Sequence, residues 1–221
     1  MTKITSLMFL IVLTAATSCA QTDNNKTISD LTARLRSGDV TVSKILADKK
    51  YLPLHPLSSF REMIRQNAKS SEVTIVTANE PGQKISVTGS IVDKNDKPVS
   101  NALMYFYHTN NKGLYGNSED DNDSRVSRLF GYLTTNDKGE FTIHTIKPNG
   151  YPASEANAHI HLQFWDKDGN EIRDTPGEFL FEDDPRMNAA RKQSAMNAGF
   201  LVSANSGTAG NPVYNYKVQL K

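Results

Sequence analysis

The sequence contains a single cysteine, Cys19, among its 221 residues. No disulfide can therefore form within the chain, and no site can be built from several thiolates. Bulk charge is also missing, because 25 lysines and arginines stand against 24 aspartates and glutamates. A chain with this balance has no general attraction for nucleic acid or an anionic membrane surface, so we exclude nucleic-acid binding. Its 38% hydrophobic and 22% charged residues are typical of one globular domain.

Long hydrophobic runs are absent apart from one short stretch. Residues 4–16 are apolar and follow Lys3, but they are too few to span a membrane. A basic start followed by a short apolar run is the pattern of an export signal. Cys19 comes after small residues, which resembles a bacterial lipobox, so we expect residues 1–18 to be a lipoprotein signal and Cys19 to carry a lipid anchor. An ordinary cleaved signal is the alternative, and both predict an exported protein, membrane-anchored or else periplasmic or secreted.

The periodicity of the chain changes near residue 73. Residues 19–27 are polar and predict a tether, and residues 28–72 predict a helical segment, most clearly at 58–68. From residue 73, β-branched residues and apolar alternation predict strands. The predicted strands are 73–77, 85–91, 102–108, 129–135, 140–146, 159–166 and 214–220, with one helix at 185–196.

Turn compositions separate these strands. Residues 93–99, 136–139 and 166–169 are rich in Asp, Asn, Lys, Gly and Pro, which is typical of turns, and the last two predict hairpins. Many short strands at such spacing favour an antiparallel sandwich over a parallel sheet. We therefore predict a mainly β protein, with an antiparallel β-sandwich over residues 73–221 behind the short helical segment.

Two histidines stand one residue apart in the predicted strand 159–166. His159 and His161 share one face of that strand, with Ile160 on the other, because side chains alternate. Two imidazoles held in this way can bind one metal ion. Tyr115 and Tyr151 lie in glycine-flanked turns, and their oxygens become hard anionic ligands if a highly charged cation displaces their protons. Packing histidines and ordinarily hydrogen-bonded tyrosines are the alternatives for each residue alone.

Segments in matching order give residues 80–185 a resemblance to the intradiol ring-cleavage dioxygenases, the family of catechol 1,2-dioxygenase and protocatechuate 3,4-dioxygenase. The matching segments are Val87–Asp93, Lys97–Ala102, Lys112–Tyr115, Thr134–Phe141, Thr145–Pro152 and His159–His161. The resemblance implies that Tyr115, Tyr151, His159 and His161 hold one non-haem Fe(III). It also implies a catechol-type substrate and O2, with the ring opened between its hydroxyls to a muconate-type diacid. Tyr151 would be the displaced ligand and internal base, and Tyr115 the equatorial ligand.

One position departs from the family pattern. The better-known members carry an arginine a few residues before the first histidine, where its charge steadies negative charge on the substrate. This chain reads Glu155-Ala-Asn-Ala158 there. Arg125 and Arg128 are candidate replacements, although a solvated surface position is expected for both.

The remaining histidines stand alone in the sequence and are expected to be structural. They are His55, His108 and His144. Two other functions compete with ring cleavage: a non-catalytic sandwich module of the transthyretin or carboxypeptidase-regulatory type, and a metal-binding lipoprotein without the reaction. The sequence leaves open which aromatic substrate is used and whether the chain forms a homo-oligomer.

Overall fold

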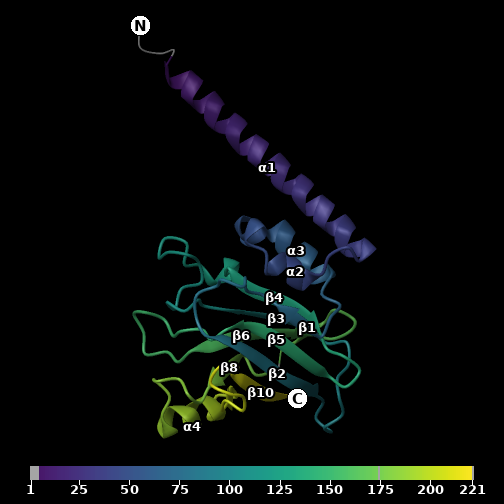
Figure 1. The fold of residues 1–221 in the computed structure, drawn as a ribbon, viewed down its shortest axis with the longest axis vertical. Helices are drawn as coiled ribbons and strands as arrows, with labels where there is room; N and C mark the ends of the chain where they lie inside the picture. Colours follow the sequence, from purple (N-terminus) through teal and green to yellow (C-terminus); the bar gives the residue numbers. More distant parts are fainter. Residues whose placement is uncertain (1–4, 174, 221) are drawn as a thin grey trace. The chain divides into compact units, whose positions relative to one another are not determined.

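The computed structural model describes the backbone of residues 5–173 and 175–220, and their side chains from residue 21 onward. Two compact units divide between Thr41 and Val42. The first contains α1 (Thr5–Ser37), which runs through the expected tether, so that polar segment is helical (Figure 1). The side chain of Cys19 and the first residues of the expected export signal lie outside the described part. Within that part, no helix has both the length and the apolar composition that crossing a membrane requires.

The second unit begins with short helices. These are α2 (Val42–Leu46), the 3-10 helix η1 (Lys49–Leu54) and α3 (Ser58–Gln66). The prediction of a helix near residues 58–68 is confirmed, and its apolar face buries Phe60, Met63 and Ile64. This face packs onto β4, while α2 packs onto β1 (Figure 1).

The strands of the second unit form two sheets. The four-stranded sheet has the order β1 (Glu72–Thr74), β5 (Glu140–Ile146), β2 (Lys84–Val92) and β10 (Val213–Gln219). The other sheet has the order β4 (Leu129–Thr134), β3 (Leu103–His108), β6 (His159–Trp165), β8 (Glu178–Phe181) and β9 (Leu201–Ser203), with β7 (Glu171–Ile172) paired to β6. The predicted strands are thus confirmed, and the last helix, α4, is shorter than expected, at Ala189–Asn197.

The sheets are mixed, which corrects the expectation of a purely antiparallel sandwich. Three pairs are parallel: β1 with β5, β10 with β2, and β8 with β9. In each pair the two strands are distant enough in sequence for the connecting chain to return to its starting end, which a parallel pair requires. The alternation of apolar and polar residues along a strand does not indicate whether that strand pairs parallel or antiparallel with its neighbour.

Two of the predicted turns join different sheets. The turn at 93–99 connects β2 to β3, and the turn at 136–139 connects β4 to β5, so each strand crosses to the opposite layer. The strand 102–108 is therefore not the returning partner of β2, and the predicted hairpin at 136–139 is wrong. The turn at 93–99 is itself present, and of the two predicted hairpins the one at 166–169 is confirmed, because Phe164 and Trp165 pair with β7 across it.

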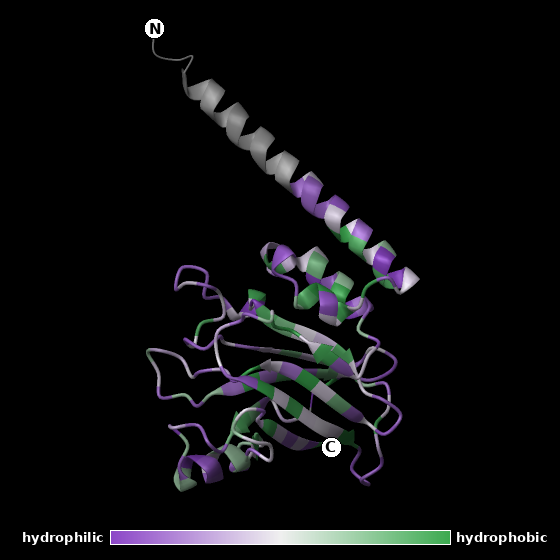
Figure 2. Ribbon diagram, in the orientation of Figure 1, coloured by the Kyte–Doolittle hydropathy of each residue, from purple (hydrophilic) through white to green (hydrophobic). Residues whose placement is uncertain are grey.

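Aromatic rings fill the space between the two sheets. Phe179 of β8 stacks on Tyr216 of β10 at 4.1 Å between ring centroids, and on Phe141 of β5 at 6.0 Å. Hydropathy alternates along the strands in Figure 2, as expected for sheets with one buried face. Ile160 points into this core and is fully buried. The histidines on either side of Ile160 therefore occupy the outer face of their sheet.

Candidate metal centre

Strand β6 places His159 and His161 on its outer face, as the alternation predicts. The strand is held on both sides, since His161 lies opposite Tyr107 of β3 and opposite Glu178 of β8. The two imidazole rings are nearly perpendicular, with centroids 4.5 Å apart. A strand in the middle of a sheet fixes its backbone firmly, so the two rings are held at a defined separation.

The turns that carry the two tyrosines are fastened to each other. The Asn149 N–H donates to the carbonyl of Asn110 at 3.2 Å, and the Thr109 hydroxyl donates to the carbonyl of Asn149 at 2.6 Å. Gly113 has a φ of 80°, and a Cβ there would lie 2.3 Å from the carbonyl oxygen of Gly150. Glycine is required at residue 113 both for this backbone conformation and for the close approach of the turns. The contact positions Tyr115 and Tyr151 together.

The four predicted ligands meet at one point, and we call Tyr115, Tyr151, His159 and His161 the metal centre. The Tyr115 hydroxyl is 2.5 Å from the Tyr151 hydroxyl and 2.8 Å from Nε2 of His161. The Tyr151 hydroxyl is 2.9 Å from Nε2 of His159 and 3.2 Å from Nε2 of His161. The two Nε2 atoms are 3.0 Å apart. Donor atoms that share one ion at about 2.1 Å have neighbour separations of about 3 Å, so the spacing suits a single cation.

Hydrogen bonding alone does not satisfy these contacts. The Nδ1 of His159 lies 2.7 Å from the carbonyl of Asn157, which can only accept, so this nitrogen carries the proton. The Nδ1 of His161 faces the Glu178 carboxylate at 3.5 Å, too far for a strong hydrogen bond, and the negative charge of that carboxylate favours the tautomer with the proton on Nδ1. Both Nε2 atoms therefore turn lone pairs inward, and the five contacts share only two hydroxyl protons. Lone pairs crowded in this way are stabilised by a positive ion.

The electrostatics of the metal-free centre favour neutral side chains. Burial raises the pKa values of the Tyr115 and Tyr151 hydroxyls, and for Tyr115 the hydrogen bond with Tyr151 adds to the rise. Burial, helped by the nearby His159 and His108, lowers the pKa of His161 to about 4. The imidazole is thus ready to bind a metal near neutral pH, whereas both phenols lose their protons only to a strongly charged cation.

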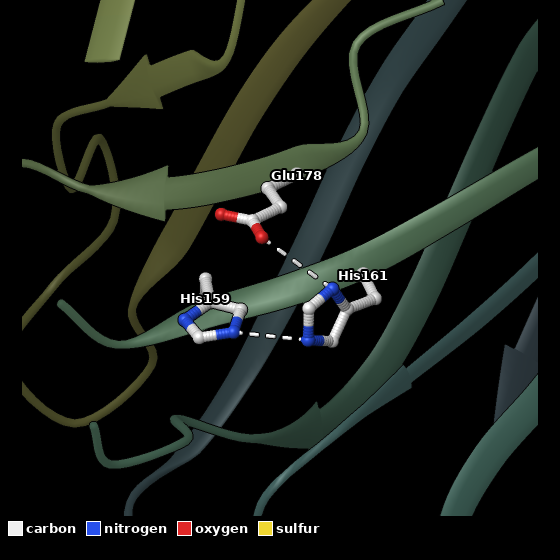
Figure 3. A group of neighbouring side chains, drawn as sticks. All are labelled: His159, His161 and Glu178. Atoms are coloured by element: carbon white, nitrogen blue, oxygen red, sulfur yellow. Dashed lines mark hydrogen bonds and ion pairs between the residues drawn. The ribbon is translucent and has the colours of Figure 1, made fainter. Parts of the chain in front are cut away.

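Glu178 lies behind the histidines, and the sequence analysis did not identify it. Figure 3 shows His159, His161 and Glu178 as a compact group in which three ligand atoms lie within 4.8 Å of one another. The carboxylate approaches the Nδ1 side of His161, away from the Nε2 atom that faces His159 (Figure 3). Glu178 is therefore an outer partner that orients His161. The apolar run after Gly177 is a local signal for the strand β8, but it does not indicate the pairing with β6 that brings Glu178 beside His161.

The two tyrosines of the metal centre differ in their exposure to solvent. Tyr115 is 7% exposed, whereas Tyr151 is half-buried and lines a cavity of about 350 Å³ that His159 and Glu178 also line. Tyr107, a further residue that the sequence did not single out, stacks on His161 with ring centroids 4.7 Å apart. Tyr151 is thus the tyrosine that a molecule in the cavity would meet.

The two candidate arginines have other partners. Arg125 is exposed and pairs with Asp123 at 2.7 Å, as expected for a surface residue. The expectation of a solvated position is wrong for Arg128, whose side chain is 11% exposed and holds both oxygens of the Glu80 carboxylate, at 2.8 and 2.6 Å. Bidentate pairing with a buried carboxylate explains why this arginine is inside. Neither guanidinium is directed at the metal centre by these contacts.

The lone histidines have structural partners. His55 Nδ1 lies 2.8 Å from the carbonyl of Arg128, and the fully buried His108 bridges the carbonyl of Thr109 and the hydroxyl of Thr145. His144 bonds to Ser86 and Glu72 at the surface. These contacts agree with the structural roles expected for all three.

Comparisons with known proteins give the family. A family model described as "Dioxygenase" matches residues 59–213, well over half of the chain. The protocatechuate 3,4-dioxygenase beta chain of Burkholderia cepacia is 34% identical over 50% of this chain and 52% of its own length. The catechol 1,2-dioxygenase of Acinetobacter baylyi is 29% identical over 32% of this chain and 22% of its own. The chain thus spans about half, or less, of these curated relatives.

Solved structures support the same fold. The dioxygenase domain of a carbohydrate-binding fusion from Streptomyces sp. SirexAA-E has a TM-score of 0.52 at 22% identity, covering 67% of this chain and 86% of that one. A chlorocatechol 1,2-dioxygenase from Pseudomonas putida has a TM-score of 0.53 at 16% identity, covering 69% and 66%. On the family match and the identities of its relatives, the chain belongs to the intradiol ring-cleavage dioxygenases.

Proposed function

We propose that this protein is a non-haem Fe(III) dioxygenase that opens a catechol-type ring between its two hydroxyls, using O2. The observation that carries the proposal is the convergence of two phenol oxygens and two imidazole nitrogens at separations of 2.5–3.2 Å. Phenolates are hard, strongly donating ligands that favour the ferric state, and imidazole also suits iron. A non-catalytic sandwich module has no use for such a group of inward lone pairs.

The residues of the centre would have different tasks. A ferric ion held by these four residues would supply the positive charge that attracts a catechol and would activate its ring toward dioxygen. Tyr151 borders the cavity, so its oxygen is the one placed to leave the ligand set and take a proton from an incoming diol. Tyr115 is more deeply buried and would remain a ligand. Glu178 and the carbonyl of Asn157 hold the two imidazoles in the tautomers that keep Nε2 free.

Visible absorption and oxygen uptake test this function together. Iron-loaded protein should be coloured by phenolate-to-iron charge transfer, should consume O2 with catechol, and should release a diacid that contains both atoms of 18O2. A colourless protein at full iron occupancy would reject the two-tyrosine site. A coloured protein without O2 uptake would support the alternative, a metal-binding protein that does not cleave rings.

A matched pair of tyrosine variants locates the effect. Tyr151→Phe should shift the charge-transfer band and reduce kcat, since it removes one oxygen from the centre. Tyr132→Phe removes a hydroxyl from β4, where the ring stacks on Tyr105 at 4.7 Å. The Tyr132 variant should keep the colour and the activity of the unmodified protein.

A further inference from the structure

Asp184 is a buried acidic residue in the turn that follows β8, and it is only 6% exposed. Its Oδ2 accepts from the backbone N–H of Ala158 and from the side-chain amide of Asn157 at 3.3 Å, while Oδ1 accepts from the backbone N–H of Arg186 at 2.9 Å. In the described part of the chain, these donors to the carboxylate are all uncharged. A carboxylate removed from water strongly polarises the N–H groups that donate to it.

One of these donors belongs to a peptide group that also contacts the metal centre. The Ala158 N–H and the Asn157 carbonyl are the two ends of one peptide bond, and a trans peptide points them in opposite directions. The carbonyl lies 2.7 Å from Nδ1 of His159 and accepts the proton of that nitrogen. The peptide therefore lies between the Asp184 carboxylate and the His159 imidazole and joins them by two hydrogen bonds in series.

Hydrogen bonds in series strengthen one another. Because the carboxylate attracts the N–H hydrogen, electrons of the peptide shift toward its carbonyl oxygen, which becomes a better acceptor for the Nδ1 proton of His159. A better acceptor behind Nδ1 leaves more electron density on Nε2, the atom that faces the other ligands of the metal centre. The peptide thus transmits the effect that a carboxylate has when it contacts a metal-binding imidazole directly.

The other imidazole also has a carboxylate behind it. Glu178 approaches Nδ1 of His161 directly at 3.5 Å (Figure 3), whereas Asp184 reaches His159 through the peptide. Strand β8 carries Glu178 and leads into the turn that carries Asp184, so a single segment supplies both carboxylates.

A purely structural role is the alternative for Asp184. The same turn holds the segment before β6 at a second point, where Nη1 of Arg186 donates to the carbonyl of Ala156 at 3.1 Å. A Cβ on Gly150 would overlap this nitrogen, so the two segments are closely packed there. The contact of Asp184 differs from the contact of Arg186 because the peptide that it binds continues to an imidazole of the metal centre.

We propose that Asp184 is a positioning residue for the metal centre, which acts on His159 through the peptide between Asn157 and Ala158. It keeps the proton of this imidazole on Nδ1 and makes Nε2 a stronger donor to the bound cation. The proposal rests on the proposed function only in taking that cation to be ferric iron. Removal of the partner behind a metal-binding imidazole lowers metal affinity by about 10- to 100-fold, which sets the scale of the expected effect.

Asp184→Asn removes the charge with little change of shape, and Asp183→Asn makes the same change on the preceding residue. The Asp183 carboxylate pairs with Lys147 at 2.7 Å and accepts from the Tyr214 hydroxyl at 2.8 Å, so its contacts do not lead to His159. In Asp184→Asn the dissociation constant for Fe(III), measured by competition with a graded chelator, should rise by about tenfold. Asp183→Asn should leave it unchanged.

Nitrogen NMR of the metal-free variants separates the peptide connection from a general loss of structure. Long-range 1H–15N correlations show which nitrogen of each imidazole is protonated. In Asp184→Asn the Nδ1 proton of His159 should move upfield or transfer in part to Nε2, while the signals of His161 stay in place. Asp183→Asn should give the spectrum of the unmodified protein. Asn157→Ala should do so too, since it removes a side-chain contact to Asp184 but keeps the peptide.

The unmodified protein provides a test that does not depend on the stability of a variant. Gallium(III) is a diamagnetic ion with the charge of ferric iron, and its binding at Nε2 makes the Nδ1 proton of His159 a stronger donor. The effect should pass through the peptide and move the Ala158 amide proton downfield. The amide proton of Arg186, which donates to the other oxygen of Asp184, should move much less.

The outcomes separate this inference from the proposed function. If folded Asp184→Asn protein has the iron affinity and the His159 signals of the unmodified protein, the proposal is wrong and Asp184 only holds the turn. Equal weakening of iron binding in the Asp183 variant would also overturn it, because a general field would then be responsible. An Ala158 amide proton that does not respond to gallium would contradict it as well. The proposed function fails separately, if the iron-loaded unmodified protein consumes no O2 with catechol.

Discussion

Polar side chains from distant segments meet in two regions of this protein, and their hydrogen bonding differs. The first region is the arginine cluster, made of Arg61, His55, Tyr105, Ser127 and Phe130. There the guanidinium donates to the carbonyls of His55 and Ser127 at 3.3 and 3.0 Å and to the Tyr105 hydroxyl, and it lies 3.7 Å from the Phe130 ring centroid. The second region is the metal centre, where five close contacts share two protons.

The comparison separates a structural polar group from a binding one. In the arginine cluster each short contact joins a donor to an acceptor, and although the Nε2 of His55 has no hydrogen-bond partner, the guanidinium contacts stabilise the fold without an added ion. In the metal centre four acceptor atoms share two hydroxyl protons, which leaves the Nε2–Nε2 contact of 3.0 Å without a proton, and a positive ion would stabilise this arrangement. Burial does not distinguish the regions, since both are largely removed from water. The two regions differ instead in the number of hydrogen-bond donors relative to the number of acceptors.

The largest expected effect is the loss of iron in His161→Ala. Structural zinc sites with four ligands hold their ion with about 10–16 kcal/mol, so by analogy one donor of four is worth about 2.5–4 kcal/mol, or roughly 10²- to 10³-fold in affinity. Metal analysis after dialysis against a graded chelator measures this loss. If the variant retains iron at full stoichiometry, His161 is not a ligand, and the distinction between a binding region and a structural region fails.

The arginine cluster should respond in the opposite way. Arg61→Met keeps much of the side-chain volume but leaves two buried carbonyls without their donor, so we expect the free energy of unfolding to fall by about 2–4 kcal/mol. Urea unfolding followed by circular dichroism measures the change. The folded variant should bind iron at the same stoichiometry as the unmodified protein. Loss of iron from a folded Arg61 variant would show that the two regions are coupled.

The stability of the arginine cluster should depend on pH through His55. Burial lowers the pKa of this imidazole to about 4, below its ordinary value of 6.5. Between these values the unfolded chain binds a proton that the folded chain does not, so the free energy of unfolding decreases as pH falls from 6.5 toward 4. For one imidazole the total decrease in the free energy of unfolding is roughly 3 kcal/mol. Above pH 6.5 and below pH 4 this imidazole causes no further change with pH.

His55→Asn tests this assignment. Asparagine presents an amide N–H to the Arg128 carbonyl but does not titrate, so the loss of stability on acidification should become smaller. His108, whose pKa burial also lowers to about 4, accounts for part of the slope that remains. Urea unfolding of metal-free protein at pH 7.5, 5.5 and 4.5 provides the slopes. Equal slopes for the two proteins would exclude His55 as a source.

The smallest effect is expected from Cys19, which belongs to neither region. We propose that this cysteine is lipidated after export, so Cys19→Ala should abolish incorporation of labelled palmitate. Because residue 19 precedes the second unit, both iron content and unfolding of that unit should be unchanged. Equal labelling of the variant and the unmodified protein would reject the anchor.

The sequence predicts the strands and the four residues of the metal centre better than it predicts how they are arranged. Alternation locates β2, β4 and β5 because one face of each is buried. The turns at 93–99 and 136–139 set a local bend but not the sheet that the next strand joins, so the crossings between layers were missed. Their direction depends on which buried faces fit together, a property of the whole core.

The wider site shows the same limit. The two tyrosines and two histidines are recognised because they lie in an ordered set of motifs. Glu178 follows that set in the sequence and reaches His161 only through the pairing of β8 with β6. Arg128 was expected in solvent because its partner, Glu80, is far from it in sequence. Neither contact has a local signal.

The parallel pairing of β10 with β2 has a consequence for the order of assembly. Strand β2 is synthesised early, and one of its edges has no hydrogen-bonded partner strand until residues 213–219 have been synthesised. The strands β3, β6 and β8, which carry or flank the two histidines of the candidate site, are complete before then. Pairing between segments so distant is slow, and an open sheet edge attracts other chains in the meantime. The interval before β10 arrives is therefore when a newly made chain is most exposed to aggregation.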